Sequence, residues 1–340
     1  MINIILTLDY EIFGNGNGDV KKHIINPTNL ILQTCNKYKI PLTIMFEVNE
    51  YLKFEEYDKA LTLDLGYSPA TIIKEQISDA FNSGHDIQLH IHPQWIDAKY
   101  ENKKWLMKNP NRSITELSKY KINKVINTGV NSIQSLLSPI NINYRCTAMR
   151  LTNLPWVEAP SEVFPHMKKN RIIVHSLSTA DAIKNNNKGY WSLDKSNLIY
   201  EIPIHSILTN KYKKLTPRRT KAALYRKIFT KNYSSKKITS DKQKKLIVKK
   251  FLSIFWEKTS IKWDFSKQSF KSMEKFLTIA MNKYNYKTFE VPLIMIGHSK
   301  DFFNSKNLDI FFNNITNDSI KYENVRFISL SKFINNEILK

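Results

Sequence analysis

Two short segments of the chain place acidic and imidazole side chains at the ends of apolar runs. Asp9 and Glu11 follow the first run, and His90 and His92 follow the second. Because strand side chains change face at every residue, each pair lies on one face of its strand. Carboxylates and imidazoles are costly to bury without partners, and one divalent metal satisfies three of these four groups. The two segments together indicate a metal-dependent hydrolase.

The elements that must position these side chains alternate along the sequence. Runs typical of strands are expected at 3–9, 41–47, 86–92, 142–148, 171–175, 199–204, 288–296 and 325–330. Helix starts lie between several of them, at Pro27-Thr28, at Ser68-Pro69 and at the capping box of Ser113 and Glu116. This alternation predicts a parallel sheet with helices packed outside it. If the sheet closes, catalytic groups collect at the carboxyl ends of its strands.

Composition narrows the class of protein. With 340 residues, 42% of them hydrophobic, the chain can bury a substantial core. Its cysteines, Cys35 and Cys146, indicate no disulfide framework and favour a reducing compartment. The apolar run 4–8 is too short for a signal peptide, and no stretch approaches the ~18 apolar residues of a membrane span. We therefore expect a cytoplasmic protein. Export or anchoring through a partner is the alternative.

The net charge of +22 is concentrated in one segment. Residues 210–250 hold sixteen Lys and Arg against one acidic residue, Asp241, so that the local net charge is +15 and the rest of the chain carries +7. Capping patterns at Thr216-Pro217 and Ser240 predict two helices there, within a basic insertion over 205–285. A solvated insertion explains this segment, and so does docking onto an anionic membrane surface or a phosphate-bearing, lipid-linked glycan. Nucleic acid is disfavoured, because no nucleic-acid-binding motif accompanies the charge.

The same residues resemble the motifs of the NodB-type polysaccharide deacetylases, a carbohydrate esterase family. The motifs that carry the resemblance are Asp9-Tyr10-Glu11, Gly84-His85-Asp86-Ile87 with His90-Ile91-His92-Pro93, Tyr144-Arg145-Cys146, Leu293 to His298, and Val325 to Leu330. They are scattered over nearly the whole chain. The resemblance implies a single catalytic domain over 1–340, folded as a distorted (β/α) barrel with about seven parallel strands.

The resemblance also implies roles for individual residues in removing an acetyl group, N-acetyl before O-acetyl, from a sugar of a glycan. Asp9 would be the general base that accepts a proton from water, and Arg145 would orient it and keep it ionised. His298 would protonate the departing amine. A divalent metal, with zinc first, would be held by Glu11, His90 and His92.

One departure from the family pattern leaves alternatives open. The family usually places three residues between its two metal-binding histidines, and the position four beyond His90 is Gln94. A His-x-His pair could still bind metal because both rings share one strand face. Gln94 could instead offer a weak neutral oxygen, or the metal could be lost, which would leave a catalytically inactive glycan-binding protein. A metal-dependent phosphoesterase is a third class, although such sites commonly use two metals.

Overall fold

A computed structural model of the chain describes residues 1–152, 160–177, 188–196, 198–210 and 257–339. The chain divides into two compact units, the first formed by Met1–His205 with Lys262–Lys340 and the second by Ser206–Ile261. β10 (Ser206–Asn210) and β11 (Lys258–Lys262) form a two-stranded sheet, and all of their residues except Lys262 belong to the second unit. The predicted helices of the basic segment 210–250 lie outside the described residues.

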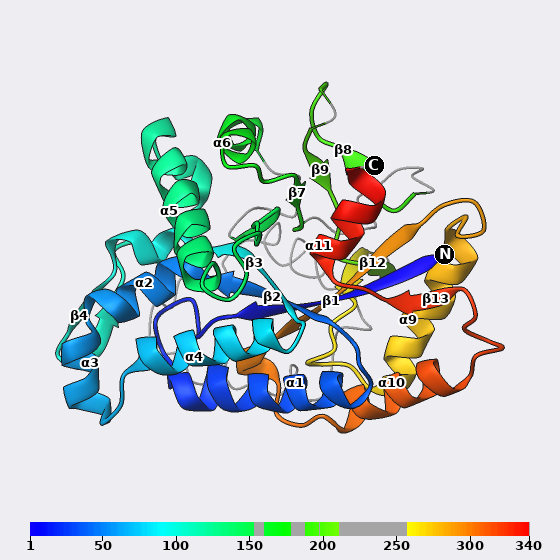
Figure 1. The fold of residues 1–340 in the computed structure, drawn as a ribbon, viewed down its shortest axis with the longest axis horizontal. Helices are drawn as coiled ribbons and strands as arrows, with labels where there is room; N and C mark the ends of the chain where they lie inside the picture. The colour runs from blue at the N-terminus through cyan, green and yellow to red at the C-terminus, as the bar shows by residue number, and fades with distance from the viewer. Residues whose placement is uncertain (153–159, 178–187, 197, 211–256, 340) are drawn as a thin grey trace, which may run out of the picture. The chain divides into compact units, whose positions relative to one another are not determined.

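The first unit is built on one large sheet of mainly parallel strands (Figure 1). Among the described residues, the parallel strands lie in the order β12 (Val291–His298), β1 (Ile2–Tyr10), β2 (Leu42–Glu47), β3 (Asp86–Ile91), β6 (Ala148–Leu151), β7 (Val174–His175) and β9 (Tyr200–Glu201). Two short strands complete it: β13 (Val325–Phe327) runs parallel to β1, and β8 (Trp191–Ser192) runs antiparallel to β9. β4 (Lys99–Glu101) and β5 (Lys104–Leu106) form a separate hairpin.

The sheet curls back until its two sides meet. Beyond β9, Ile204 forms a parallel bridge with Ile294 of β12, and Asp264 forms another with Ile296. The backbone amide of His205 donates to the carbonyl of Ile294 at 2.9 Å. These isolated bridges close the circle without a full strand, so the expected distorted (β/α) barrel with about seven parallel strands is confirmed.

Helices lie outside the sheet, as the alternation predicted (Figure 1). They are α1 (Asn26–Lys37), α2 (Val48–Glu56), α3 (Asp58–Leu65), α4 (Pro69–Asn82), α5 (Lys119–Leu137), α6 (Phe164–Lys169), α9 (Phe270–Lys283), α10 (Lys306–Asn317) and α11 (Leu330–Phe333). The Ser68 hydroxyl caps α4 by accepting from the amide of Thr71, as expected. The predicted capping box of Ser113 and Glu116 is present, but it closes a single 3-10 turn, and α5 begins three residues later.

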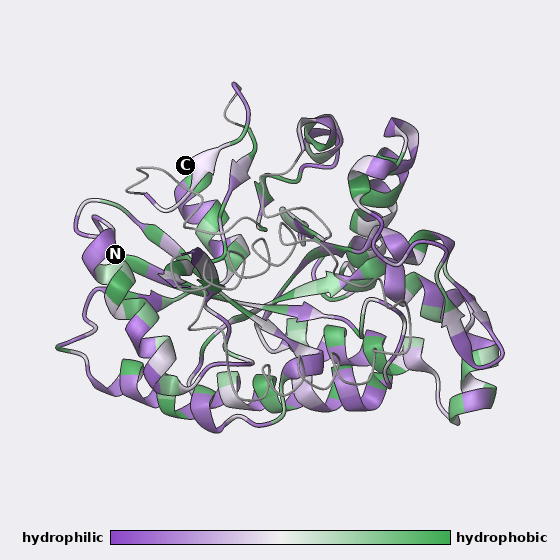
Figure 2. Cartoon of the chain, turned by 180° about the vertical axis from the view of Figure 1, so that it is seen from behind, coloured by the Kyte–Doolittle hydropathy of each residue, from purple (hydrophilic) through white to green (hydrophobic). Residues whose placement is uncertain are grey.

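The barrel interior is apolar around the middle of the strands and polar at their carboxyl ends. Ile5, Met45, Ala148, Val174 and Ile294 belong to one fully buried cluster inside the sheet. Figure 2 shows hydrophobic residues concentrated on the central strands and hydrophilic residues on the outer faces of the helices. Because β1 alternates, the inward face that begins at Ile5 continues through residues 7 and 9. The apolar core therefore supports a layer of polar side chains at the carboxyl end of the barrel.

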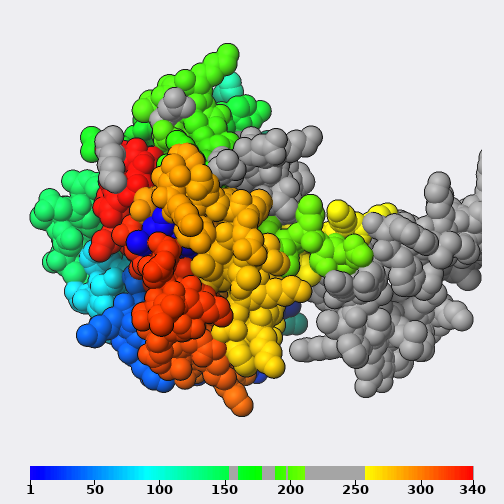
Figure 3. All heavy atoms as spheres, turned by 90° about the vertical axis from the view of Figure 1, so that its right-hand side faces the viewer, coloured from blue at the N-terminus to red at the C-terminus, as the bar shows by residue number. Residues whose placement is uncertain are grey.

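The N-terminal strand lies at the centre of the first unit. Figure 3 shows the first residues of the chain, in blue, enclosed by the orange and red C-terminal segments. β1 pairs with β12 over eight residues, from Ile2 with Val291 to Asp9 with His298, and it pairs with β2 on its other side. Motifs almost 290 residues apart in the sequence are thus neighbours in space.

Two segments differ from the sequence-based expectations. The strand expected at 142–148 begins only at Ala148, because a turn closed by the Tyr144 amide takes up 141–144 and the Thr147 amide donates to the side chain of Gln88 instead of to a strand backbone. The range 262–285, which the sequence assigns to the insertion, lies in the first unit. Many of its apolar residues, including Trp263 and Phe276, are buried there. Within the described residues, no helix has both the length and the apolar character needed to cross a membrane.

Candidate metal centre and catalytic residues

Asp9 lies on the inward face at the end of β1, and its carboxylate is held by an arginine. Arg150, on β6, donates from Nη1 to the Asp9 Oδ1 atom. The same guanidinium is itself fixed, because Nη2 donates to Thr7 Oγ1 at 3.0 Å and Nε donates to the Ser176 carbonyl at 2.8 Å. Burial alone would raise the pKa of Asp9, but the nearby Arg150, His90 and His298 lower it to about 2. Asp9 is therefore an ionised carboxylate with one fixed oxygen and one oxygen, Oδ2, directed elsewhere.

The arginine expected at Asp9 was Arg145, and that prediction is wrong. Arg145 is exposed, and its guanidinium donates to the carbonyls of Ile142 and Tyr144 in the turn before β6. Since the strand begins at Ala148 and not at 142, the arginine that points into the barrel is Arg150. The residue type was anticipated, and its position depended on where the strand starts.

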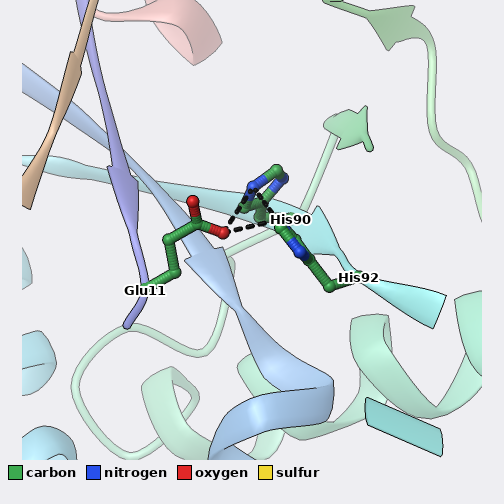
Figure 4. A group of neighbouring side chains, drawn as sticks. All are labelled: Glu11, His90 and His92. Atoms are coloured by element: carbon green, nitrogen blue, oxygen red, sulfur yellow. Dashed lines mark hydrogen bonds and ion pairs between the residues drawn. The ribbon is translucent and has the colours of Figure 1, made fainter. Parts of the chain in front are cut away.

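Glu11, His90 and His92 converge at one point near the end of β1 and β3 (Figure 4). Their nearest ligand atoms all lie within 4.8 Å of one another, and all three side chains are buried. Glu11 Oε2 contacts His92 Nε2 and lies 3.4 Å from His90 Nε2, while the two Nε2 atoms are 3.1 Å apart. The geometry thus directs one carboxylate oxygen and two imidazole nitrogens toward a common centre.

These three residues fit a metal such as zinc in donor type, number and orientation. The Nδ1 atom of His90 must donate to the Arg150 carbonyl, 3.0 Å away, which leaves its Nε2 lone pair free to face the centre. Such a second partner on the far ring nitrogen is the usual arrangement of a metal-binding histidine. The buried Glu11 Oε2 accepts no conventional hydrogen bond. In the part of the chain that the structure describes, this is the one group of His, Cys, Asp and Glu side chains close enough to hold a metal.

The second oxygen of Glu11 is held by a lysine that the sequence analysis did not single out. Lys300 follows His298 in a 3-10 turn, Ser299–Asp301, and its ammonium group donates to Glu11 Oε1 and to the Ile12 carbonyl. Burial would raise the pKa of Glu11, but His92, Lys300 and His90 hold it well below its ordinary value. The pKa of Lys300 is raised, because Glu11 outweighs the effect of burial. Glu11 and Lys300 are therefore both charged.

His298 also lies beside the Oδ2 atom of Asp9. Its Nε2 atom lies 3.6 Å from Asp9 Oδ2, and its Nδ1 atom lies 3.9 Å from Asp264 Oδ2. Burial lowers the pKa of His298 despite both carboxylates, so the ring is neutral near pH 7. Asp264 was missed in the sequence because it falls in the range assigned to the insertion. The imidazole is nevertheless placed between two carboxylates, which would stabilise its protonated form.

Gln94 does not lie among the convergent groups. It is buried in the 3-10 turn Pro93–Asp97, and its amide nitrogen lies 2.8 Å from His92 Nδ1, the ring nitrogen that faces away from Glu11. The suggestion that Gln94 supplies a metal-binding oxygen therefore has no support in this geometry. Its side chain contacts the back of a candidate ligand.

Comparison with known proteins establishes the fold. No protein-family model matches the sequence, and no curated protein matches it. A solved structure described as a probable polysaccharide deacetylase from Pseudomonas aeruginosa PAO1 superposes with a TM-score of 0.50, covering 100% of this chain and 93% of that chain at 10% identity. The chain has the fold of a polysaccharide deacetylase.

Other solved structures that match the chain carry different names. The Puue allantoinase matches with a TM-score of 0.49 at 10% identity, over 99% of this chain and 91% of its own. A family 4 acetyl xylan esterase from Clostridium thermocellum matches with a TM-score of 0.42 at 12% identity, over 98% and 91%. At such identities the likeness extends to the polysaccharide deacetylase fold alone, so function has to be argued from the side chains.

Proposed function

We propose that the protein is a metal-dependent deacetylase that hydrolyses an acetyl group, N-acetyl before O-acetyl, on a sugar of a polysaccharide or glycan precursor. The observation that carries this proposal is the position of Asp9. Its Oδ2 atom lies 3.9 Å from Nε2 of His90, one of the three convergent residues, and 3.6 Å from Nε2 of His298. A ligand set, a general base and a general acid then occur in the order that acyl hydrolysis requires.

A metal held by Glu11, His90 and His92 would polarise the acetyl carbonyl and lower the pKa of the attacking water. Asp9 would accept the proton of that water at Oδ2, because Oδ1 is held by Arg150. Oδ2 lies 3.6 Å from His298 Nε2, longer than a direct hydrogen bond, so one bridging water or a small approach of the two groups would carry the proton to the imidazole and on toward the leaving nitrogen as the carbon–nitrogen bond breaks. Asp264 would stabilise the transient imidazolium. The products are acetate and a free amino sugar.

No observation specifically favours either alternative, a binding-only protein or a metal-dependent phosphoesterase. A binding-only protein would not need the Arg150–Asp9–His298–Asp264 arrangement, in which charged partners hold the candidate base and the candidate acid next to each other. A two-metal phosphoesterase would need a second group of ligands, and the described residues contain one such group. From the sequence alone, we also propose a cytoplasmic location with contact of 210–250 to an anionic membrane surface or a lipid-linked glycan.

The test measures metal content and acetate release together. The purified protein should retain about one zinc per chain without chelators and should release acetate from a small N-acetylated oligosaccharide. Glu11→Gln and His90→Ala should each lose the metal and the activity, because one of three protein ligands is removed. A protein that binds no divalent metal, or both variants retaining full occupancy, would contradict the proposal. Release of acetate from O-acetylated sugars alone would exclude the amide as the preferred bond.

A further inference from the structure

Gln94 is buried against the ring of His92 and is enclosed by the loop that follows β1. Its side-chain nitrogen lies 2.8 Å from His92 Nδ1 and 3.4 Å from the Gly14 carbonyl. A Cβ atom at Gly14 would come within 3.3 Å of the same amide nitrogen, so the loop backbone lies directly over the amide. The side chain is 3% exposed and carries no charge. Its position is therefore fixed, while the identity of the atom facing His92 is decided by a rotation of the amide.

The contacts of Gln94 imply one proton at the centre of the site whenever no metal is bound there. With its nitrogen toward the ring, Gln94 donates to His92 Nδ1, so that the His92 proton resides on Nε2. That Nε2–H donates to His90 Nε2, 3.1 Å away, which has a lone pair because His90 Nδ1 donates to a carbonyl, and Glu11 Oε2 lies beside the pair. One proton is thus shared by the two inward-facing nitrogens of His90 and His92, next to Glu11 Oε2, which accepts no conventional hydrogen bond.

A metal in the centre requires the opposite tautomer of His92. Its Nε2 atom must then offer a lone pair, so the proton leaves Nε2 and another is taken up on Nδ1, which leaves the ring neutral. A proton on Nδ1 needs an acceptor on the far side of the ring. A half-turn of the Gln94 amide exchanges its nitrogen and oxygen and supplies that acceptor, at the loss of the long 3.4 Å contact between the amide nitrogen and the Gly14 carbonyl.

We propose that Gln94 is a positioning residue that selects the tautomer of His92, donating to Nδ1 in the metal-free protein and accepting from it when a metal is bound. This inference rests on the proposed metal dependence. A primary amide is suited to both states, because it carries a donor and an acceptor at one end. A carboxylate at this place could only accept, and an aliphatic side chain could do neither.

The experiment compares zinc affinity in Gln94→Glu, the parent protein and Gln94→Leu, using competition with a chromophoric chelator. Glu favours the metal-bound tautomer, so the affinity should fall in the order Glu, Gln, Leu, with Gln94→Leu about 10–100-fold weaker than the parent. Gln33→Leu, on the exposed face of α1, is the matched control and should bind zinc like the parent. Circular dichroism of each metal-free variant checks that the fold is retained.

Nitrogen NMR of the histidine rings tests the tautomer without any activity measurement. In the metal-free parent, His92 should carry its proton on Nε2, and in the zinc form on Nδ1. In metal-free Gln94→Glu the proton should already be on Nδ1. A parent with the Nδ1–H tautomer before metal is added would overturn the proposal, even if Gln94→Leu proved too unstable to measure.

The outcomes separate this inference from the proposed function. A parent that binds no zinc refutes the metal dependence itself. A parent that binds zinc with the same affinity as Gln94→Leu refutes the role of Gln94 and leaves the metal site in place. If cobalt-substituted Gln94→Leu shows an absorption spectrum with one ligand fewer than the parent, Gln94 is a direct ligand, and the positioning role is wrong.

Discussion

Asp9 and Glu11 share one face at the end of one strand, yet the structure treats their carboxylates differently. Asp9 is paired with a guanidinium that is itself braced by Thr7 and Ser176. Glu11 is divided between Lys300 on one oxygen and two imidazoles on the other. Both pKa values are low, but only the partners of Glu11 can exchange a proton for a metal. Asp9, the proposed base, is held in place by residues of its own and a nearby strand. The candidate ligands, in contrast, would be complete only with a metal between them.

The largest expected effect comes from removing the base while keeping the ligands. Asp9→Asn keeps the size of the side chain but cannot accept a proton, so deacetylation should fall by roughly 10²–10⁴-fold. Zinc content should stay at the parent value, because Asp9 is not one of the convergent ligands. Acetate release and metal analysis on the same preparation check both statements. Retention of most of the activity would remove Asp9 from the mechanism.

The second prediction distinguishes the two arginines. Arg150→Met removes the main group that lowers the pKa of Asp9, and burial then raises that pKa above about 2. Below the raised pKa the base is protonated, so the acidic limb of the pH–rate profile should move to higher pH. Activity near neutral pH should fall at least tenfold. Arg145→Met is the matched control, and its profile should overlay that of the parent, since Arg145 contacts only turn carbonyls among the interactions described. An unshifted acidic limb in Arg150→Met would show that Asp9 does not set it.

The smallest expected effect concerns the other carboxylate. Lys300 places a positive charge on the oxygen of Glu11 that does not face the centre, and this charge opposes the entry of a divalent cation. Lys300→Met should therefore raise zinc affinity, by roughly tenfold, or about 1.4 kcal/mol. Lys267→Met, which removes a lysine paired with Asp264 and Asp301 instead, should leave the affinity near that of the parent. Weaker zinc binding in Lys300→Met would mean that the lysine mainly holds Glu11 in position.

The sequence predicted most of the barrel because its central strands carry local signals. The runs around β1, β2 and β3 are apolar and end in polar residues, and their alternation alone brought Asp9, Glu11, His90 and His92 to one edge. The structure places these four together with His298, and their roles stay predictions. The start of β6 had no comparable signal, and the resulting error of several residues exchanged Arg150 for Arg145.

Other partners could not be found by reading along the chain. Asp264 reaches His298 through the bridge to Ile296 that closes the barrel, and such a contact depends on which strands meet. Lys300 contacts Glu11 across almost the full length of the sequence. Gln94 was noticed as a departure from a pattern, but only the ring orientation of His92 shows which of its nitrogens the amide faces. The local periodicity of a sequence predicts neither which distant strands pair nor how a side chain is rotated.

Arg150 contacts both the proposed base and one of the candidate metal ligands, the first with its side chain and the second with its backbone. Its guanidinium holds Asp9, while its backbone carbonyl accepts from His90 Nδ1. Mutation can delete the guanidinium, but every amino acid retains the carbonyl. During divergence, a single substitution at this position could therefore silence hydrolysis and leave metal capture intact, whereas no substitution there could do the reverse. Descendants of such a protein are more readily expected as metal-loaded binders than as metal-free catalysts.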